Sequence, residues 1–370
     1  MVTRKNIVRM VAVSSLLAPL AGAAPLYTVT PIGSLGGASG DVSDLNNVSQ
    51  IVGYSLSAGS IRQAYLSEGG SSRSLHPNWA TASHAFSIND AGISAGSVTA
   101  DGVTQAVTFA GTKVNLLGSL GGEGASSVAS AINNSGQVAG TSALADPGVQ
   151  RAFRYSSGAM QDLGTLGGNN SEARAINARG DVAGQADVSG SGAYHAFLHS
   201  NGRMADLGTL GGSFSTANAV NDSGVVAGFS YLAADAYAHA FRFVDGRMQD
   251  LGTLGGANSY ALGMNSRGDI VGNSEVVAGG PTHAFIYANG TMVDLNSLVD
   301  PDLDWVLRYA ADINDAGQIA VLGCAESGLM CEGFLLNPVP EPETWGMLAC
   351  GGMLVALAAR RRRRAGLTSS

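Results

Sequence analysis

The chain has little charge and few aromatic residues, and these scarcities limit what it can be. Asp, Glu, Lys and Arg make up 13% of the 370 residues, and Phe, Trp and Tyr make up 6%. Glycine is abundant but does not recur at every third position, which excludes a collagen triple helix. The 52 Gly and 10 Pro together stay below the roughly 25% of residues that marks low-complexity disorder. Since 45% of the residues are hydrophobic, the chain can bury a large core.

Signals of nucleotide binding and nucleophilic catalysis are also missing. The recurring string Leu-Gly-Thr-Leu-Gly-Gly lacks the lysine and the spacing of a phosphate-binding loop, and no helix is expected after it. No nucleophile elbow or Ser-His-Asp order is recognisable, although a triad can be scattered along a sequence. The sequence therefore predicts no catalytic residue and no cofactor.

The N-terminal residues 1–23 have the layout of a secretory signal peptide. Arg4, Lys5 and Arg9 precede an apolar stretch over 10–20, and small residues follow at 21–23. The apolar stretch is shorter than the ~20 residues of a membrane span, and an uncleaved anchor is the alternative. Signal peptidase is the expected partner, and the rest of the chain is predicted to leave the cytoplasm.

The C-terminal segment 338–370 combines a short motif, an apolar run over 345–359 and an arginine cluster. The motif consists of Val339, Pro340, Glu341 and Pro342. The cluster consists of Arg360, Arg361, Arg362, Arg363 and Arg364. The apolar run predicts a short transmembrane helix, and the arginines would hold their end in the cytoplasm because they cross a bilayer only at high cost. So short a span suits transient anchoring.

This three-part tail resembles the PEP-CTERM sorting signal. The resemblance implies recognition of the Pro-Glu-Pro motif and removal of the tail by exosortase, a membrane enzyme of Gram-negative bacteria. The implied destination is the outer surface or the extracellular matrix, reached through a membrane-anchored intermediate. The resemblance concerns sorting and gives no activity.

Without its two terminal signals the chain is strongly acidic. Residues 25–342 contain 12 Lys and Arg but 27 Asp and Glu, a net charge of −15 against −8 for the full chain. This balance argues against a basic surface for nucleic acid or anionic polysaccharide. Cys324 and Cys331 lie in a predicted hairpin loop and are expected to form a disulfide in an oxidising compartment. A metal or redox pair is the weaker alternative, because partner ligands are missing.

Residues 27–337 form an internal repeat with a period of 44 residues. The glycine string occurs at 163–168, 207–212 and 251–256, with near copies at 32–37 and 117–122. In each unit an asparagine marks a turn, and in all but the first a glycine follows three residues later, as type I turns prefer. The asparagines with this glycine are Asn89, Asn133, Asn177, Asn221, Asn265 and Asn314. Asn46 begins the series with Ser49 in place of glycine, so seven units are predicted.

A His-Ala-Phe triplet is the third repeated marker. It occurs at 195–197, 239–241 and 283–285, with variants in the other units. Together with the glycine strings, these triplets resemble the HAF repeat of bacterial extracellular proteins. The resemblance covers nearly all of 27–337, and no general activity comes with it.

Each unit is expected to hold four short strands. In the fourth unit they are predicted at 171–176, 181–185, 195–199 and 204–207, and Asn201-Gly202 is a strong hairpin signal between the last two. Bulky and small residues alternate along the third strand, which suits sheets covered on both faces. The fold predicted is all-β, a seven-bladed β-propeller in which a strand at 27–32 completes the last blade. A β-solenoid is the alternative.

Several polar residues invite a catalytic or metal-binding interpretation, but their recurrence predicts a structural role. Histidine starts the triplet in only three units, and Arg151 and Glu332 stand at equivalent positions, which argues against a metal site. The aspartates before the glycine strings recur, whereas an active site is normally unique. The histidines are His195, His239 and His283, and the aspartates are Asp162, Asp206, Asp250 and Asp294.

The one candidate calcium loop is incomplete. Asp300, Asp302 and Asp304 alternate as calcium ligands do, but the glycine and the late glutamate of a calcium loop are missing. We therefore expect a surface loop and predict no metal site.

Two functions stay open. The first is an exported, non-enzymatic binding or matrix module associated with extracellular polysaccharide. The alternative is an extracellular glycan hydrolase or lyase with acidic residues near one mouth of the propeller. An unrepeated Asp or Glu required for turnover would favour the enzyme.

Overall fold

The computed structural model describes residues 26–36, 40–57, 59–190, 192–325 and 330–339. The predicted signal peptide lies outside these residues, as do the arginine cluster and the predicted transmembrane helix at 345–359. Within the described residues, no helix combines the length and the apolar character needed to cross a membrane.

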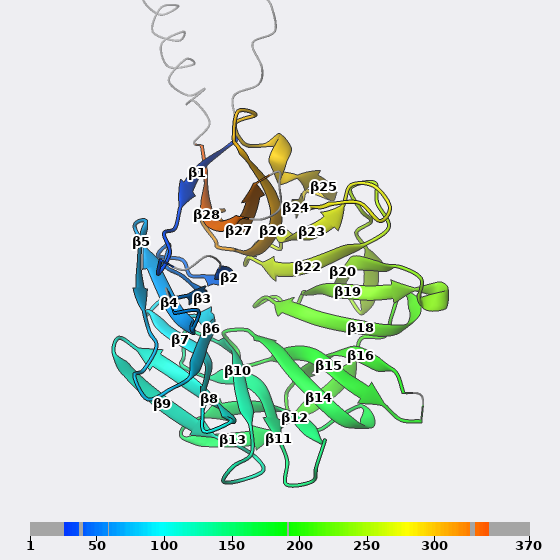
Figure 1. Cartoon of the computed structure of the whole chain (residues 1–370). Helices are drawn as coiled ribbons and strands as arrows, with labels where there is room; N and C mark the ends of the chain where they lie inside the picture. Colours follow the sequence, from blue (N-terminus) through cyan, green and yellow to red (C-terminus); the bar gives the residue numbers. More distant parts are fainter. Residues whose placement is uncertain (1–25, 37–39, 58, 191, 326–329, 340–370) are drawn as a thin grey trace, which may run out of the picture.

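The described residues form seven blades of four antiparallel strands around a central axis, and a parallel bridge between Tyr194 and Phe214 joins blades 4 and 5 into one eight-stranded sheet (Figure 1). Blade 1 consists of β2 (Gly40–Leu45), β3 (Ile51–Leu56), β4 (Arg62–Glu68) and β5 (Ser71–Ser74). Blade 2 consists of β6 (Ala82–Ile88), β7 (Ile93–Ala100), β8 (Val103–Ala110) and β9 (Lys113–Gly118). Blade 3 consists of β10 (Ser127–Ile132), β11 (Val138–Ala143), β12 (Gln150–Ser156) and β13 (Ala159–Asp162).

The next three blades repeat this order. Blade 4 consists of β14 (Gly167–Ile176), β15 (Val182–Val188), β16 (Tyr194–Ser200) and β17 (Arg203–Asp206). Blade 5 consists of β18 (Gly211–Val220), β19 (Val226–Leu232), β20 (Ala238–Val244) and β21 (Arg247–Asp250), with the 3-10 helix η1 (Ala233–Asp235) between β19 and β20. Blade 6 consists of β22 (Ser259–Met264), β23 (Ile270–Glu275), β24 (Thr282–Ala288) and β25 (Thr291–Asp294) and is followed by the 3-10 helix η2 (Leu295–Ser297).

Blade 7 joins the two ends of the described chain. It consists of β26 (Trp305–Ile313), β27 (Ile319–Ala325), β28 (Cys331–Pro338) and β1 (Tyr27–Pro31). β1 pairs antiparallel with β28, from Tyr27 opposite Pro338 to Pro31 opposite Phe334. This pairing closes the ring and covers an edge that would otherwise be free to pair with another chain. It confirms the predicted propeller, and separate antiparallel sheets do not fit the solenoid alternative.

The blades pack through the phenylalanine of each triplet. Phe153, Phe197, Phe241 and Phe285 are fully buried, as are the alanines that precede them, so both faces of the third strand are covered. Within blade 3, a Cβ atom at Gly140 would lie 2.8 Å from Phe153 Cζ and would also meet the carbonyl of Val128. Only glycine leaves room for the ring there, which explains why part of the glycine excess lies in the second strands.

A serine at the start of an inner strand connects consecutive blades. The Ala196 amide of blade 4 donates to Ser215 Oγ of blade 5 at 2.8 Å, and Ser215 Oγ donates to the Gly208 carbonyl at 2.6 Å. The same contacts recur between Ala152 and Ser171 and between Ala240 and Ser259. A buried hydroxyl that both donates and accepts satisfies two backbone groups at each junction.

Candidate functional site

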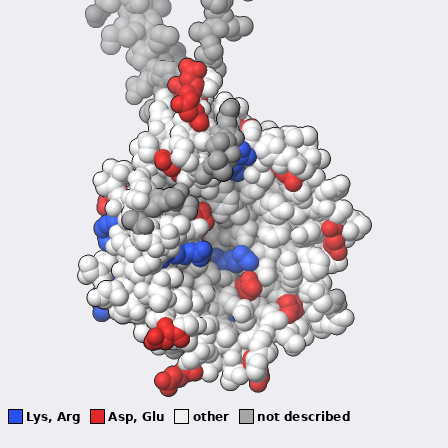
Figure 2. Space-filling view, in the orientation of Figure 1, with Lys and Arg blue, Asp and Glu red and all other residues white. Residues whose placement is uncertain are grey.

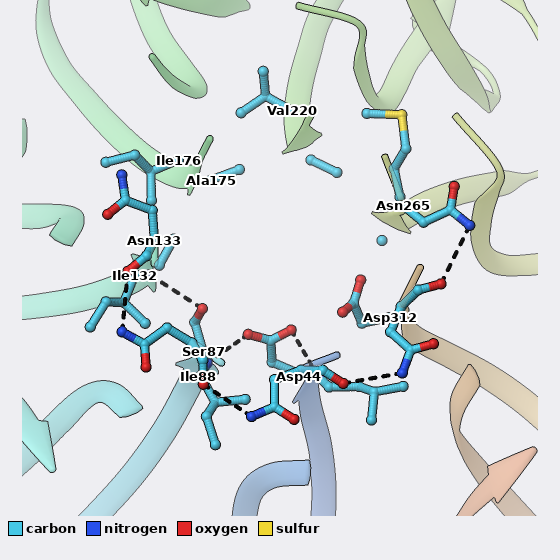
Figure 3. A pocket seen from close by; sticks show the side chains of 18 of the residues that line it. Asp44, Ser87, Ile88, Ile132, Asn133, Ala175, Ile176, Val220, Asn265 and Asp312 are labelled. Carbon is cyan, nitrogen blue, oxygen red and sulfur yellow. Dashed lines mark hydrogen bonds between the residues drawn. The ribbon is translucent and has the colours of Figure 1, made fainter. Parts of the chain in front are cut away.

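The first strands of the seven blades line a central channel with a volume of about 330 Å3. These inner strands are β2, β6, β10, β14, β18, β22 and β26. Figure 3 shows side chains from different strands pointing into the same space. Residues from every repeat meet in the channel, so a residue that departs from the repeat makes one side of it differ from the others.

The asparagine turns connect inner and second strands at one mouth of the channel. Asn133 Nδ2 donates to the Asn177 carbonyl of the next blade at 2.9 Å, and Asn314 Nδ2 donates to the Asn46 carbonyl at 3.1 Å across the ring closure. Six of the seven turn asparagines of the described residues donate in this way: Asn46, Asn89, Asn133, Asn177, Asn265 and Asn314. Ser49, which replaces the turn glycine of the first unit, adopts the positive φ of 66° that glycine would supply.

Each inner strand contains a β-bulge at the same position, three residues before the turn asparagine. The pairing register shifts there in all seven blades. A bulge adds one unpaired residue and re-aims the side chains around it. The extra residues are Ser43, Phe86, Ser130, Arg174, Asn218, Leu262 and Ala311, and all of them line the channel. The repeat thus presents its most variable residues along its axis.

The residue after the bulge distinguishes one side of the channel from the other. It is an aspartate in blades 1 and 7 and a serine in blade 2, but alanine or glycine in blades 3 to 6. The positions are Asp44, Ser87, Ala131, Ala175, Ala219, Gly263 and Asp312. Figure 3 shows Asp44 and Asp312 close together, with Ala175, Ile176 and Val220 across the channel. At this position the wall is therefore acidic at the ring closure and uncharged opposite it, although Arg174 and Asn218 also line the opposite side.

The two aspartates also connect blades. Asp44 Oδ1 accepts a hydrogen bond from the Leu45 amide at 2.8 Å, and Asp44 Oδ2 accepts from the Ile88 amide of blade 2 at 2.7 Å. Asp312 accepts from the amides of Ile313 and of Leu45, the latter in blade 1. Each aspartate thus accepts a hydrogen bond from a backbone amide of the following blade. Ser87 Oγ does the same and accepts from the Ile132 amide at 3.3 Å.

The carboxyl groups of Asp44 and Asp312 lie within hydrogen-bonding reach of each other. Burial raises the pKa of Asp312 well above its usual range, and the adjacent Asp44 raises it further, while the two amides oppose this effect. Two buried carboxyl groups side by side are costly to ionise together, so this geometry favours a proton held between them.

Basic and aromatic side chains gather near the channel as well. Figure 2 shows Lys and Arg atoms over the central hollow of the face in view, while Asp and Glu atoms lie mostly toward its rim. The Arg62 guanidinium lies 4.4 Å from the Tyr54 ring, which contacts the His84 ring edge-on. Burial and, to a smaller extent, the charge of Arg62 together lower the pKa of His84 to about 3, so this histidine is neutral at pH 7.

The repeated histidines and aspartates predicted to be structural contact each other. His195 Nδ1 lies 2.9 Å from Asp206, His239 Nδ1 lies 2.9 Å from Asp250, and His283 Nδ1 lies 2.7 Å from Asp294. Each pair joins the third strand of a blade to its fourth. In blade 3, Arg151 and Asp162 take the same places at 3.8 Å. The pairs repeat along the blade edges and are not gathered around the axis.

The other predicted residues lie near the ring closure. Cys324 and Cys331 are joined by a disulfide at the end of the β27–β28 hairpin. Asp300 and Asp302 lie in the loop before β26, where the Asp302 amide donates to Asp300 Oδ1 at 3.0 Å. In the part of the chain that the structure describes, no group of three His, Cys, Asp or Glu side chains is arranged to hold a metal ion.

The acid pair was not predicted from the sequence. Asp44 and Asp312 stand at the only two units with an acid two residues before the turn asparagine, so alignment of the seven units does contain a signal. The alignment does not show that the first and last units are neighbours, because they become adjacent only when the ring closes.

Comparison with known proteins identifies the tail. Residues 338–364 match the family model described as the PEP-CTERM protein-sorting motif. The chain carries a PEP-CTERM sorting motif. This motif implies an exported protein that is sorted by exosortase. The match covers the tail alone, so the resemblance of the repeats to HAF-repeat proteins stays a prediction, and no curated protein matches the chain.

Solved structures resemble the blades only distantly. A puromycin-hydrolyzing peptidase from Mycobacterium tuberculosis has 11% identity and a TM-score of 0.51, over 84% of this chain and 56% of the peptidase. TolB from Acinetobacter baumannii has 15% identity and a TM-score of 0.43, over 57% of this chain and 53% of TolB. YCF48 bound to D1 peptide has 11% identity and a TM-score of 0.49, over 86% of this chain and 96% of YCF48. The chain thus spans about half the length of the first two, and the likeness to the peptidase shows the fold alone.

Proposed function

We propose that the protein is a non-enzymatic binding module of the outer cell surface or extracellular matrix, associated with polysaccharide. The observation that carries this proposal is the sorting motif behind a closed propeller whose repeated polar residues are occupied in structural bonds. The asparagines, serines and histidines of the repeat bind neighbouring blades or strands. The residues that differ from blade to blade face the channel or lie at the blade edges, as expected of a scaffold that displays a binding surface.

Polysaccharide is the favoured partner because of where the chain goes and how little charge it has. Export by this signal supports a location among the glycans of the cell surface, in the Gram-negative setting that the resemblance implies. An acidic domain with a net charge of −15 over 25–342 is soluble and is repelled by nucleic acid. Recognition would therefore rest on hydrogen bonds and aromatic contacts.

The test is fractionation of producing cells. The full chain should remain with the extracellular polysaccharide and should be released into the medium when polysaccharide synthesis is blocked. A variant that lacks residues 340–370 provides the matched control for sorting, because it keeps every strand of the propeller. Equal release from cells with and without polysaccharide would contradict the proposal.

The alternative is an extracellular glycan hydrolase or lyase, and the acid pair is the one observation in its favour. Asp44 and Asp312 are unrepeated, paired and open to the channel. However, glycosidases separate their two carboxyl groups by about 5–9.5 Å to accommodate the sugar and water, whereas these groups are in direct hydrogen-bonding reach. Both oxygens of Asp44 also accept backbone amides. The binding function is therefore preferred, and polysaccharide turnover that disappears in Asp312→Asn would reverse the choice.

A further inference from the structure

Blade 5 departs from the repeat in its aromatic residues. In blades 4 and 6, the position seven residues before the turn asparagine is Asn170 or Asn258, and each bonds a carboxylate at the end of the second strand. Asn170 Nδ2 donates to Asp187 at 2.9 Å, and Asn258 Nδ2 donates to Glu275 at 2.8 Å. In blade 5 the same two positions hold Phe214 and Tyr231, whose rings are 5.7 Å apart.

Neighbouring blades extend this pair into a cluster. The Tyr194 ring of blade 4 lies 4.8 Å from Phe214, and a parallel bridge joins the two backbones. On the other side, Phe229 of blade 5 lies 5.1 Å from the Tyr260 ring of blade 6. Tyr231 is close enough to both outer tyrosines to raise the pKa of Tyr194 and of Tyr260, after the larger effect of burial. We call these five residues, Tyr194, Phe214, Phe229, Tyr231 and Tyr260, the aromatic patch.

The aromatic patch is accessible and crosses three blades. All five residues are partly buried, so each ring packs on the fold with one side and keeps some contact with solvent. Figure 1 shows β16, β18, β19 and β22 running side by side in this part of the ring. A cluster of half-exposed rings with hydroxyl groups offers both apolar faces and hydrogen-bonding groups.

The structure also compensates for the aromatic residues. Tyr231 has no carboxylate that could accept a hydrogen bond from a backbone amide of the inner strand. Asp235 of η1 takes this role and accepts from the Ser213 amide at 2.6 Å. In the loop that brings Asp235 to this amide, Ala234 and Asp235 have left-handed conformations with φ of 69° and 54°. Residues other than glycine adopt such conformations at a cost in free energy. The second strand of blade 5 therefore lacks the side-chain hydrogen bond to the inner strand that the second strands of blades 4 and 6 make.

The charges around the aromatic patch indicate a neutral ligand. Glu172, Asp235 and Glu275 lie beside it, and the cation Arg174 lies near Tyr194. An anionic ligand would meet net repulsion there. Carboxylates and phenol oxygens accept hydrogen bonds from hydroxyl groups, which a sugar carries at most ring positions, whereas a proline-rich peptide has few donors.

We propose that the aromatic patch is a binding site for a neutral glycan chain, whose sugar rings stack on the aromatic faces and whose hydroxyl groups bond the tyrosines and adjacent acids. This inference rests on the proposed polysaccharide-binding function and adds the site and the class of glycan. The site extends across the blades, so the ligand is a chain of several sugars.

The test uses the full chain and a variant built from the repeat itself. The double variant Phe214→Asn/Tyr231→Gln allows a hydrogen bond between the two side chains that are bonded in blades 4 and 6. It adds no carboxylate next to Asp235, so the blade should fold. Tyr260→Thr introduces the residue that blade 5 carries at this position. Trp79→Ser is the matched control, because Trp79 is an exposed aromatic residue of the loop between blades 1 and 2.

Binding is measured by calorimetry and by tyrosine difference absorption with cellohexaose, maltohexaose and mannohexaose, with hexagalacturonate as the anionic comparison. We expect binding to at least one neutral hexasaccharide with a tyrosine signal, a Kd raised at least ten-fold in Phe214→Asn/Tyr231→Gln, a smaller increase in Tyr260→Thr, and no change in Trp79→Ser. Unchanged affinity in the double variant would overturn the site but leave polysaccharide association standing.

Two other results would also overturn the inference. One is preference for hexagalacturonate, and the other is binding of a proline-rich peptide without binding of any neutral hexasaccharide. If no hexasaccharide binds although the chain stays with extracellular polysaccharide in cell fractions, the neutral-glycan site fails and the broader function survives. Failure of both experiments would remove the proposed function itself.

Discussion

Blades 4 to 6 and the region where the ring closes between blades 7 and 1 are stabilised by different contacts. In the regular blades, one set of contacts recurs with little change: a buried phenylalanine, a serine between backbones and a His-Asp pair. At the closure, Tyr65 replaces the phenylalanine in blade 1, the β1–β28 pairing and a disulfide stabilise blade 7, and the Asp44–Asp312 pair joins blade 7 to blade 1, while the asparagine bond is kept from Asn314 to Asn46.

Chain connectivity explains this difference. Two regular blades are joined by a short covalent loop, so each new contact orders little additional chain. The first and last blades are brought together only when the whole ring closes, and loop closure costs more entropy for longer segments. The closure therefore concentrates contacts that no other junction has.

The largest effect is expected for a fully buried ring in a regular blade. Phe285→Ala should lower the free energy of unfolding by about 3–5 kcal/mol, because it removes apolar contact and leaves a cavity. Leu336→Ala, equally buried at the closure, should cost about 2–5 kcal/mol. Urea denaturation measures both, with exposed Val277→Ala as the control. A cost below 1 kcal/mol for Phe285→Ala would mean that the blades are not packed as described.

The asparagine turns should come next. Asn177→Ala removes the bonds from Nδ2 to Asn221 and the bonds that Oδ1 accepts from the Arg179 and Asp181 amides. We expect a loss of about 2–3 kcal/mol, since buried backbone groups lose their partners. Asn314→Ala removes the same kind of bond across the closure, to Asn46, and should cost at least as much. If Asn314→Ala were neutral by thermal unfolding, the asparagine bonds would not contribute to ring closure.

The acid pair predicts a pH dependence confined to the closure. Because the pKa of Asp312 is raised in the folded state, the unfolded chain releases this proton first as pH rises above about 4. Stability contributed by this group should therefore fall with rising pH until the folded-state pKa is passed. Asp312→Asn keeps a donor toward Asp44 without the charge, so it should flatten this slope and be about 1–2 kcal/mol more stable than wild type at pH 7.

Chemical denaturation at several pH values measures this difference. Asp300→Asn, in the exposed loop before β26, is the control for general charge effects. An unchanged slope in Asp312→Asn would show that the pair does not share a proton.

The smallest effect is expected for the repeated His-Asp pairs. His283→Ala should cost about 0–1 kcal/mol, because partly exposed ion pairs contribute little. His195→Ala and His239→Ala should give the same result within error by urea denaturation, since the three pairs have equivalent places. A loss of several kcal/mol in one of them would mark that blade as different and contradict the purely structural role.

Local patterns explain how much of the fold was predictable. The 44-residue period, the Asn-x-x-Gly turns and the Asn-Gly hairpin act over a few residues, and they placed the strands of blade 4 to within a few positions except at the start of β14. β14 begins at Gly167, four residues before the predicted start, because the second glycine of the string already pairs with Val188.

The functional residues were less predictable because their neighbours are distant in sequence. Asp44 and Asp312 belong to the first and last units, and the aromatic patch takes its rings from three blades. Each residue taken alone reads as an ordinary polar or aromatic substitution within its repeat. Their chemistry depends on which strands become adjacent.

The sequence by itself determined the C-terminal sorting motif, the number of repeats, the strand and turn order, the strand that completes the last blade, and the acidic charge, because each can be read from residue patterns and composition. Only the tertiary structure showed that two aspartates lie side by side at the closure and that five aromatic rings gather around blade 5. The physical reason is that ring closure and blade packing bring together side chains that no local interaction connects.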